Sequence, residues 1–247
     1  MNTHFENLGR GFLFFALVAM CGCDFNRERV ATGELRKDVK TVALGGARSA
    51  QVTLNMKAGE LRVTGGATDL LDGDFIYNVA EWKPELTYEV NGGVGNLQVT
   101  QPGSDASVGN TRNEWDVRLN SATPTELNVN MGAGRATLTL SGMALNRLEF
   151  NMGAGETTVD LTGNWRKDLS AQIHGGVGKA TVRLPRDIGV HVIAHGGLGA
   201  INAHDLQKEG DAYVNELYGK SPITLSVEVE GGVGEIDLET VGEPPAA

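Results

Sequence analysis

A short glycine-containing pattern recurs seven times and constrains the fold more than any other feature of this sequence. Each copy has a polar residue, two small or flexible residues, a small apolar residue and a glycine, followed by alternating apolar positions. The first residues of the copies are Asn55, Asn91, Asn130, Asn151, His174, His195 and Glu230. Copies start 21–23 residues apart between Asn130 and His195 and 35–39 residues apart elsewhere. Such near-periodic similarity is typical of stacked repeat architectures.

The residues around each copy alternate between apolar and polar, as in β-strands with one buried face. Leu148, Phe150 and Met152 are apolar at even positions before the glycine, whereas Val159 and Leu161 are apolar at odd positions after it. A one-residue change of parity requires a bulge or corner, and glycine has the backbone freedom for it. We therefore predict one structural corner at each of Gly59, Gly95, Gly134, Gly155, Gly178, Gly199 and Gly234.

Equivalent positions of successive copies carry side chains that complement one another. Five residues into the central copies stand Arg135, Glu156 and Lys179, and nine residues in stand Asp160, Arg183 and His204. Opposite charges on neighbouring strands contribute about 0.2–1 kcal/mol each. The chain is therefore predicted to be an all-β, single-stranded β-solenoid of about seven repeats, in which equivalent residues stack.

The first residues indicate export rather than fold. Arg10 precedes a short apolar run, residues 11–20, which is too short for the roughly 20 residues of a membrane span and is typical of a secretory signal. Cys21-Gly22-Cys23 follows and resembles the lipidation site of bacterial lipoproteins. Gly22 favours Cys23 over Cys21 as the lipidated residue. An ordinary cleaved signal that leaves a free or paired thiol is the alternative.

The predicted organisation has five segments. These are a lipoprotein-type signal peptide (1–22), a flexible tether (23–40), an N-terminal part of the solenoid (41–126), its C-terminal repeat part (127–241) and a disordered tail (242–247).

Two stretches resemble known bacterial families. Residues 70–88 and 97–102 are similar to the N-terminal part of toast-rack domains, and the copies from 130 to 238 resemble the C-terminal domain of LiaF-like proteins. The resemblance covers roughly 45–240 and implies a β-solenoid of the cell envelope. LiaF-like proteins are associated with envelope-stress sensing, as membrane inhibitors of a sensor kinase. The sequence departs from them in that it lacks their several N-terminal membrane helices. Lipoprotein-type members are described as adhesin-like.

Composition and motifs speak against several functions. A formal net charge of −10 opposes binding to phosphate backbones, so no nucleic-acid partner is expected. The sequence contains no Gly-x-Ser-x-Gly, no His-Glu-x-x-His and no cysteine after Cys23. A strand rather than a helix follows each Gly-Gly-x-Gly, which disfavours a phosphate loop. His174, His195 and Glu230 share one repeat position and raise a zinc site as a hypothesis, but a polar surface ladder is the simpler interpretation. We expect no cofactor, no metal and no enzymatic activity.

Aromatic residues outside the repeat are expected to cover the ends of the stack. Trp82 and Tyr88 are assigned to the N-terminal end, and Tyr213 and Tyr218 lie in an insertion, residues 205–221, between the sixth and seventh copies. Exposed aromatics there could instead bind a glycan or a protein.

The expected function is that of a non-catalytic, lipid-anchored scaffold or adhesin-like protein of the bacterial envelope, periplasmic or on the outer surface. Its partners would be the membrane, through the lipid, and an envelope protein or glycan. Two alternatives stay open: a LiaF-like regulator of the envelope stress response and a carbohydrate-active β-helix enzyme.

Overall fold

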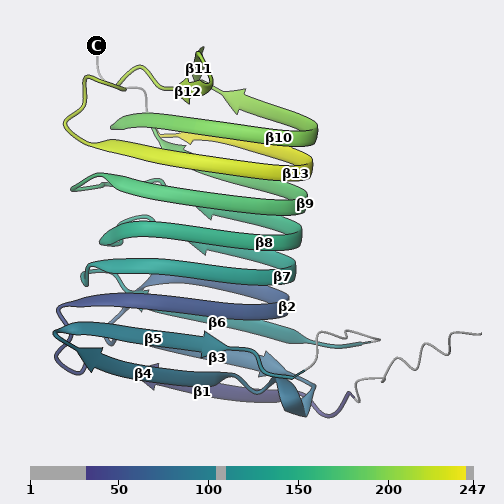
Figure 1. Cartoon of the computed structure of the whole chain (residues 1–247). Helices are drawn as coiled ribbons and strands as arrows, with labels where there is room; N and C mark the ends of the chain where they lie inside the picture. Colours follow the sequence, from purple (N-terminus) through teal and green to yellow (C-terminus); the bar gives the residue numbers. More distant parts are fainter. Residues whose placement is uncertain (1–31, 104–109, 243–247) are drawn as a thin grey trace, which may run out of the picture.

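The computed structural model describes residues 32–103 and 110–242, which form one tall stack of β-strands (Figure 1). Six long strands are its main rungs: β2 (Ser49–Ala67), β7 (Thr125–Thr139), β8 (Leu145–Asp160), β9 (Leu169–Pro185), β10 (Gly189–His204) and β13 (Thr224–Val241). The shorter strands are β1 (Arg36–Val42), β3 (Leu71–Tyr77), β4 (Glu85–Asn91), β5 (Val94–Thr100), β6 (Asn113–Asn120), β11 (Gln207–Glu209) and β12 (Ala212–Val214). A short 3-10 helix, η1, spans Ala80–Trp82.

The long strands stack in parallel with identical repeat positions in register. Their spatial order is β2, β7, β8, β9, β13 and β10. Gly134 of β7 pairs with Gly59 below it and with Gly155 above it. The prediction of an all-β solenoid is therefore confirmed, with six stacked corners among the described residues.

The last two rungs do not follow the order of the sequence. The seventh copy, in β13, lies between the fifth copy in β9 and the sixth in β10 (Figure 1). His174 and His195, which follow each other in the sequence as the fifth and sixth copies, therefore do not lie in adjacent rungs, because Glu230 lies between them.

Charge explains why β13 rather than β10 lies on β9. Lys179 and Arg183 of β9 face Glu235 and Glu239 of β13, with nitrogen–oxygen distances of 3.2 and 3.4 Å. At the same positions β10 has Ala200 and His204, which offer no carboxylate. Exposed pairs of this kind contribute little singly, but two in register favour one neighbour over the other.

The second copy is a hairpin turn rather than a corner. Asn91 ends β4 and Val94 begins the antiparallel β5, with Gly92 and Gly93 in left-handed conformations at φ 62° and 85°. Gly95 has no positive φ and pairs with Ala50 inside a regular strand. The prediction of a corner at Gly95 was therefore wrong, because a Gly-Gly pair between two short strands also makes a tight hairpin.

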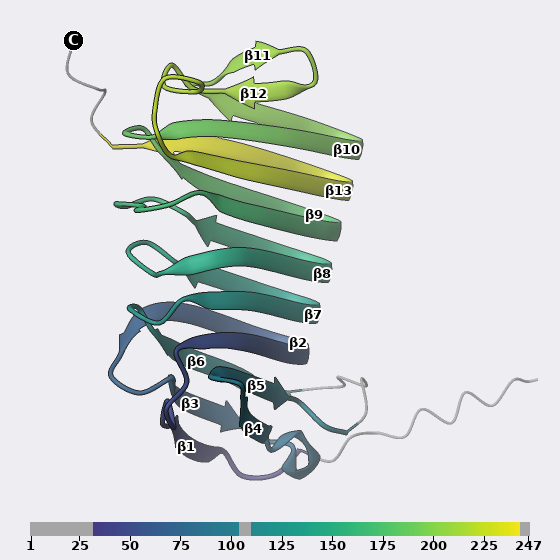
Figure 2. The same ribbon diagram turned by 60° about the vertical axis from the view of Figure 1, so that its left-hand side comes forward.

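The rung below β2 is split into two strands. β5 runs parallel to the first half of β2, and β6 runs parallel to its second half, so that no corner joins them. β3 and β1 continue the stack below β6, and β4 flanks β5 (Figure 2).

β1 starts at Arg36, which corrects the predicted tether of residues 23–40. Its residues are largely exposed and have no strong apolar pattern, so their pairing with β3 supplies the strand.

Alternating side chains from every rung fill the interior. From Leu148 onward, the buried residues of β8 lie at even positions before the corner and at odd positions after it, as predicted. At the lower end, Phe75 and Trp115 pack edge to face, with ring centroids 5.4 Å apart, and join the main core. Trp82 is buried outside that core, while Tyr88 packs against it and donates a hydrogen bond to the Leu44 carbonyl.

At the upper end, the hairpin β11–β12 covers part of β10. Tyr213 packs against the core, whereas Tyr218 is 40% exposed and lies against the His191 ring. Within the described ranges, no helix has the length and apolarity of a membrane span. The predicted signal, Cys21, Cys23 and residues 243–247 of the predicted tail lie outside the described residues.

Candidate functional site

The six corners form one continuous feature along the stack. The fifth residue of each corner copy is a glycine with φ between 130° and 146°: Gly59, Gly134, Gly155, Gly178, Gly234 and Gly199. Such angles are rarely adopted by residues with a Cβ. In each case a Cβ would also collide with a backbone carbonyl oxygen of the rung below. Two independent constraints thus require glycine at these six predicted positions.

A second glycine column precedes the first by two residues. Gly132, Gly153, Gly176, Gly232 and Gly197 have no room for a Cβ, because the carbonyl of the equivalent residue in the rung below occupies that space. Backbones therefore approach one another closely along the corner. The outer surface of the corner consists of peptide groups and the residue between the two glycines.

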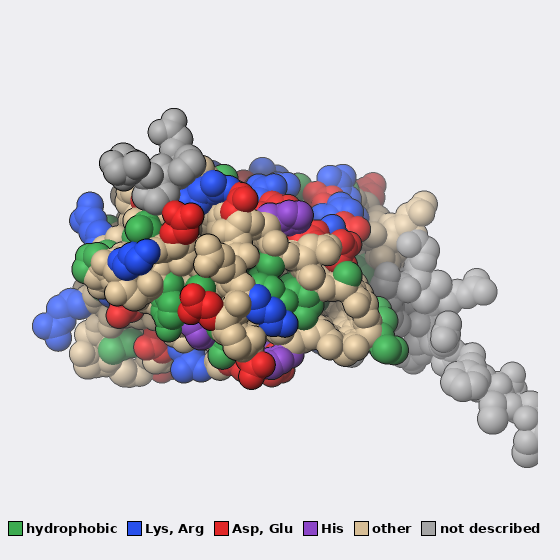
Figure 3. Space-filling model, turned by 90° about the horizontal axis from the view of Figure 1, so that it is seen from above, with side chains coloured by type: hydrophobic (Ala, Val, Ile, Leu, Met, Phe, Trp, Pro, Cys, Tyr) green, Lys and Arg blue, Asp and Glu red, His purple; other side chains and the backbone are tan. Residues whose placement is uncertain are grey.

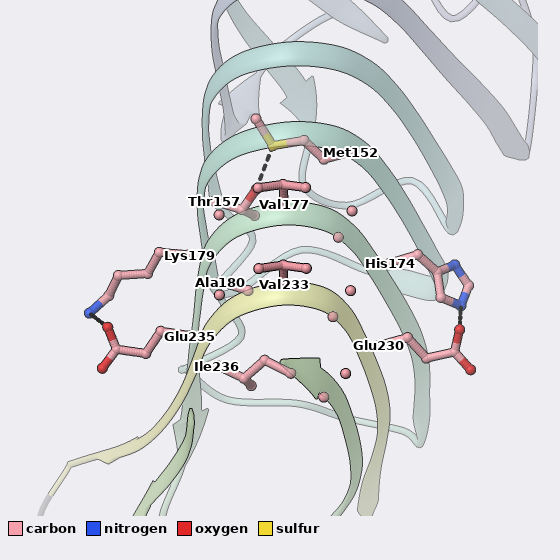
Figure 4. Close-up of a pocket in the computed structure, with 18 of the residues that line it drawn as sticks. Met152, Thr157, His174, Val177, Lys179, Ala180, Glu230, Val233, Glu235 and Ile236 are labelled. Atoms are coloured by element: carbon pink, nitrogen blue, oxygen red, sulfur yellow. Dashed lines mark hydrogen bonds and ion pairs between the residues drawn. The ribbon is translucent and has the colours of Figure 1, made fainter. Parts of the chain in front are cut away.

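That intervening residue is apolar in every rung and faces outward. We call this row the corner ridge; it consists of Ala58, Ala133, Ala154, Val177, Val233 and Leu198. The exposed fractions of Val177, Val233 and Leu198 are 57, 48 and 73%. The ridge becomes larger and more apolar towards the β10 end of the stack, as the two valines in Figure 4 illustrate.

A row of hydrogen-bonded amides lies before the ridge, and we call it the amide ladder. Asn130 Nδ2 donates to Asn55 Oδ1, and Asn151 Nδ2 donates to Asn130 Oδ1, both at 3.0 Å. His174 Nδ1 lies 2.9 Å from Asn151 Oδ1, which can only accept, so this nitrogen carries the hydrogen. His174 Nε2 then faces Glu230 Oε2 at 3.8 Å (Figure 4).

A row of alternating charges lies after the ridge, and we call it the charge ladder. Arg135 lies between Glu60, at 3.8 Å, and Glu156, at 3.2 Å. Lys179 pairs with Glu235 at 3.2 Å (Figure 4) and also with Asp237. The predicted pair of Arg135 and Glu156 is thus present, whereas Lys179 is in register with Glu156 but pairs with the carboxylates of the rung on its other side. The ladder ends at Ala200 in β10.

Asp237 is the most buried acid of this region, with 8% exposure. Burial acts to raise its pKa, but hydrogen bonds from Lys179 and Asn202 outweigh this and leave the pKa below the ordinary value. The hydrogen bond to Asp237, and then that to Glu235, raises the pKa of Lys179. These groups are held in their charged forms near neutral pH, which suits an ion pair and not proton transfer.

The corner of β9 is incompletely filled inside. In β8, Met152 and Thr157 fill the corresponding space, and in β13 Gly231 faces the larger Ile236. In β9 both positions are small, Gly175 and Ala180, and a hollow of about 30 Å³ remains between the residues of Figure 4. Glycines and apolar side chains make up most of its lining, and the charged side chains at its sides are paired with each other, His174 with Glu230 and Lys179 with Glu235. It is a packing defect of the repeat.

The zinc hypothesis for His174, His195 and Glu230 gains no geometric support. Within residues 32–103 and 110–242, no three His, Cys, Asp or Glu side chains gather so as to hold a metal ion. His174 is engaged by Asn151 on one side and lies near Glu230 on the other. The contacts of His174 with Asn151 and Glu230 fit the polar surface ladder instead.

Two amides that cap the corner of β2 were missed by sequence reasoning because no local pattern marks them. Gln101 Oε1 accepts hydrogen bonds from the backbone N–H groups of Lys57 and Ala58, at 2.9 and 3.2 Å. Asn113 Nδ2 donates to the Ala58 carbonyl at 2.8 Å. These side chains replace the missing corner of the split rung below β2, and only the folded chain brings them there.

Comparison with known proteins agrees with this architecture. The family model of the N-terminal domain of toast-rack proteins, DUF2154, matches residues 31–183. A crystal structure of a putative cell adhesion protein from Clostridium sporogenes ATCC 15579 is 39% identical and superposes with a TM-score of 0.82, covering 84% of this chain and all of that chain. A putative adhesin from Bacteroides fragilis NCTC 9343 is 9% identical, with a TM-score of 0.31 over 83% of this chain and 97% of that one. No curated protein matches the sequence. By its family match and its 39% identity to a structure it covers completely, this chain belongs to the toast-rack family of β-solenoid proteins.

Proposed function

We propose that the chain is a non-catalytic, adhesin-like scaffold of the bacterial cell envelope, anchored by a lipid on Cys23. The observation that carries this proposal is the corner surface itself. Apolar ridge, amide ladder and charge ladder run side by side through successive rungs, and the charged groups of the ladder are engaged with one another. A long regular surface of this kind offers many equivalent contacts to an extended partner and no group poised for chemistry.

The name of the 39% identical relative supports the adhesive role. The toast-rack fold alone would not, because one fold can serve many functions. The proposed partners are an envelope protein or a glycan.

The anchor is proposed from the sequence of residues 10–23. Metabolic labelling of cells with an alkyne fatty acid tests it. We expect the wild-type chain and Cys21→Ser to be labelled and Cys23→Ser to be unlabelled. Labelling that disappears with Cys21→Ser and survives Cys23→Ser would transfer the anchor to Cys21, and an unlabelled wild-type chain would refute lipidation.

The scaffold role is tested by capture of envelope partners on the full chain, with a corner-ridge variant beside it. Val177→Glu places a charge on the exposed ridge, whereas Val39→Glu places the same charge on β1, where Val39 is 64% exposed. We expect Val177→Glu to reduce capture about tenfold and Val39→Glu to leave it unchanged. Equal capture by both variants would show that the corner is not the binding surface, and purified chain that cleaves envelope polysaccharide would refute the non-catalytic role.

A further inference from the structure

The upper end of the stack has an open edge. β10 pairs with β13 along one side, while on the other side β12 pairs only with His191–Ile193 (Figures 1 and 2). Beyond Ile193, no described strand pairs with this side of β10. We call residues Ala194–His204 the β10 edge.

The lower end of the stack is closed differently. Below the corner of β2, the side chains of Gln101 and Asn113 bond the backbone groups of Lys57 and Ala58. β4 and β1, at the lower edge, are short strands that carry charged residues: Glu85 and Glu89 on β4 and Arg36, Lys37, Asp38 and Lys40 on β1. Short charged strands and side-chain caps are the usual protection of a sheet edge against further pairing.

The β10 edge lacks this protection. Its eleven residues include no Lys, Arg, Asp or Glu, although the whole chain has a net charge of −10. The charge ladder stops at Ala200, Leu198 is 73% exposed, and Ile201 and Ala203 are only partly buried against the core. Figure 3 looks onto this end, where hydrophobic side chains reach the surface. A long, neutral, apolar edge is a template for another strand.

The corner restricts which strand can fit. In each lower rung a corner carbonyl points at the rung above and leaves no room for a Cβ there. By the same geometry, the corner carbonyls of Gly197 and Gly199 point out of the open edge. A partner strand must therefore bend at the same place and carry glycine there. Another β10 meets both requirements.

The position of the hairpin β11–β12 suits a symmetric pair. The free stretch runs from Ala194 to His204, so its middle residue is Gly199. A twofold axis near Gly199 lets two β10 edges run antiparallel along their whole free length, with a hairpin from each copy beyond either end. Such an interface is self-complementary, as the commonest dimers are.

We propose that the β10 edge binds the β10 edge of a second copy of this chain, so that two stacks join end to end. Because β1 lies at the opposite end of the stack from β10, the two β1 ends point away from each other in this dimer (Figure 1). The pairing deepens the proposed function, and its consequence for the envelope rests on the lipid anchor proposed there. If each chain is anchored before β1, the dimer joins two facing surfaces by a homophilic contact.

Sedimentation equilibrium of the full chain in density-matched detergent tests the pairing directly. We expect a reversible shift from one to two copies as the concentration rises through the micromolar range. Leu198→Glu should abolish the shift, because like charges then meet near the axis. Val177→Glu is the matched control, since it adds the same charge to the same ridge two rungs below the edge, and it should still dimerise. Leu198 is exposed, so thermal melting should show both variants folded.

A full chain that is still monomeric at about 100 μM overturns the pairing. Equal loss of the dimer in Leu198→Glu and Val177→Glu overturns it as well. The trans arrangement has its own test: vesicles that carry the wild-type chain should cluster, and vesicles with Leu198→Glu should not. Dimers in solution without clustering would overturn the joining of two surfaces while leaving the pairing intact. Val177→Glu separates the two proposals, because it should lose envelope-partner capture while it still forms the dimer.

Discussion

The carbonyl oxygen of Gly155 occupies the place where any other residue at position 178 would need its Cβ. The same relationship links each corner glycine to the rung below, so the stack tolerates one residue type at this point. The rungs can approach to the ordinary spacing of about 4.8 Å only because both glycine columns lack side chains.

Replacement of Gly178 by alanine should therefore be severe. The left-handed φ of 139° and the collision with Gly155 act together, and we expect a loss of about 3 kcal/mol or more in the free energy of unfolding. Urea denaturation measures it. Gly175→Ala is the control, because a Cβ there has its nearest neighbour at 3.8 Å and φ is not positive. A loss at position 178 no larger than at 175 would contradict the steric explanation.

Filling the hollow of β9 should stabilise the protein. Gly175→Met restores the residue that Met131 and Met152 provide in the two rungs below, and we expect a gain of about 1 kcal/mol in the free energy of unfolding. Gly231→Met is the matched control, since Ile236 Cδ1 already lies 3.1 Å from the new Cβ, and it should destabilise. Thermal melting distinguishes them. Stabilisation by both changes would mean that the rungs adjust freely.

The amide ladder should couple neighbouring rungs. Asn130→Ala removes the donor to Asn55 and the acceptor of Asn151, and a cost of about 1–2 kcal/mol is expected because two partly buried amides lose a partner. Thr137→Ala on the same strand, in the second half of the rung, should cost less. Chemical denaturation of both variants provides the comparison, and equal losses would argue that the ladder adds nothing beyond side-chain packing.

Asp237 should make stability depend on pH in the acid range. Its folded pKa lies below the ordinary value of 3.8, so its contribution is present above about pH 4 and is lost as the pH falls through the folded value. Asp237→Asn should cost about 1 kcal/mol at pH 7 and nothing at the lowest pH. Unfolding curves from pH 7 to pH 2 follow this difference. Asp211→Asn, in the β11–β12 turn, should give the wild-type profile; a pH-independent cost of Asp237→Asn would refute the linkage.

Local patterns revealed the rungs because a corner is a local event. The change of parity between Phe150 and Val159 requires a bend wherever the rest of the chain lies, and Gly155 is the residue that permits it. The same reasoning failed at Gly95, because its copy lies between short strands that prefer to fold back on each other. A five-residue pattern does not show how long the flanking strands are or which strands they pair with.

The sequence by itself determined the strand alternation, the corner glycines and the charges that complement one another, because each depends on residues close together or on a repeat period. Tertiary structure alone decided the order of the rungs and the condition of the two ends. β13 lies on β9 because distant carboxylates meet Lys179 and Arg183, and Gln101 reaches the corner of β2 only when β5 has packed beside it. These contacts join segments that no local pattern links, and they leave the β10 edge as the one long rung edge of the described chain without a neighbour.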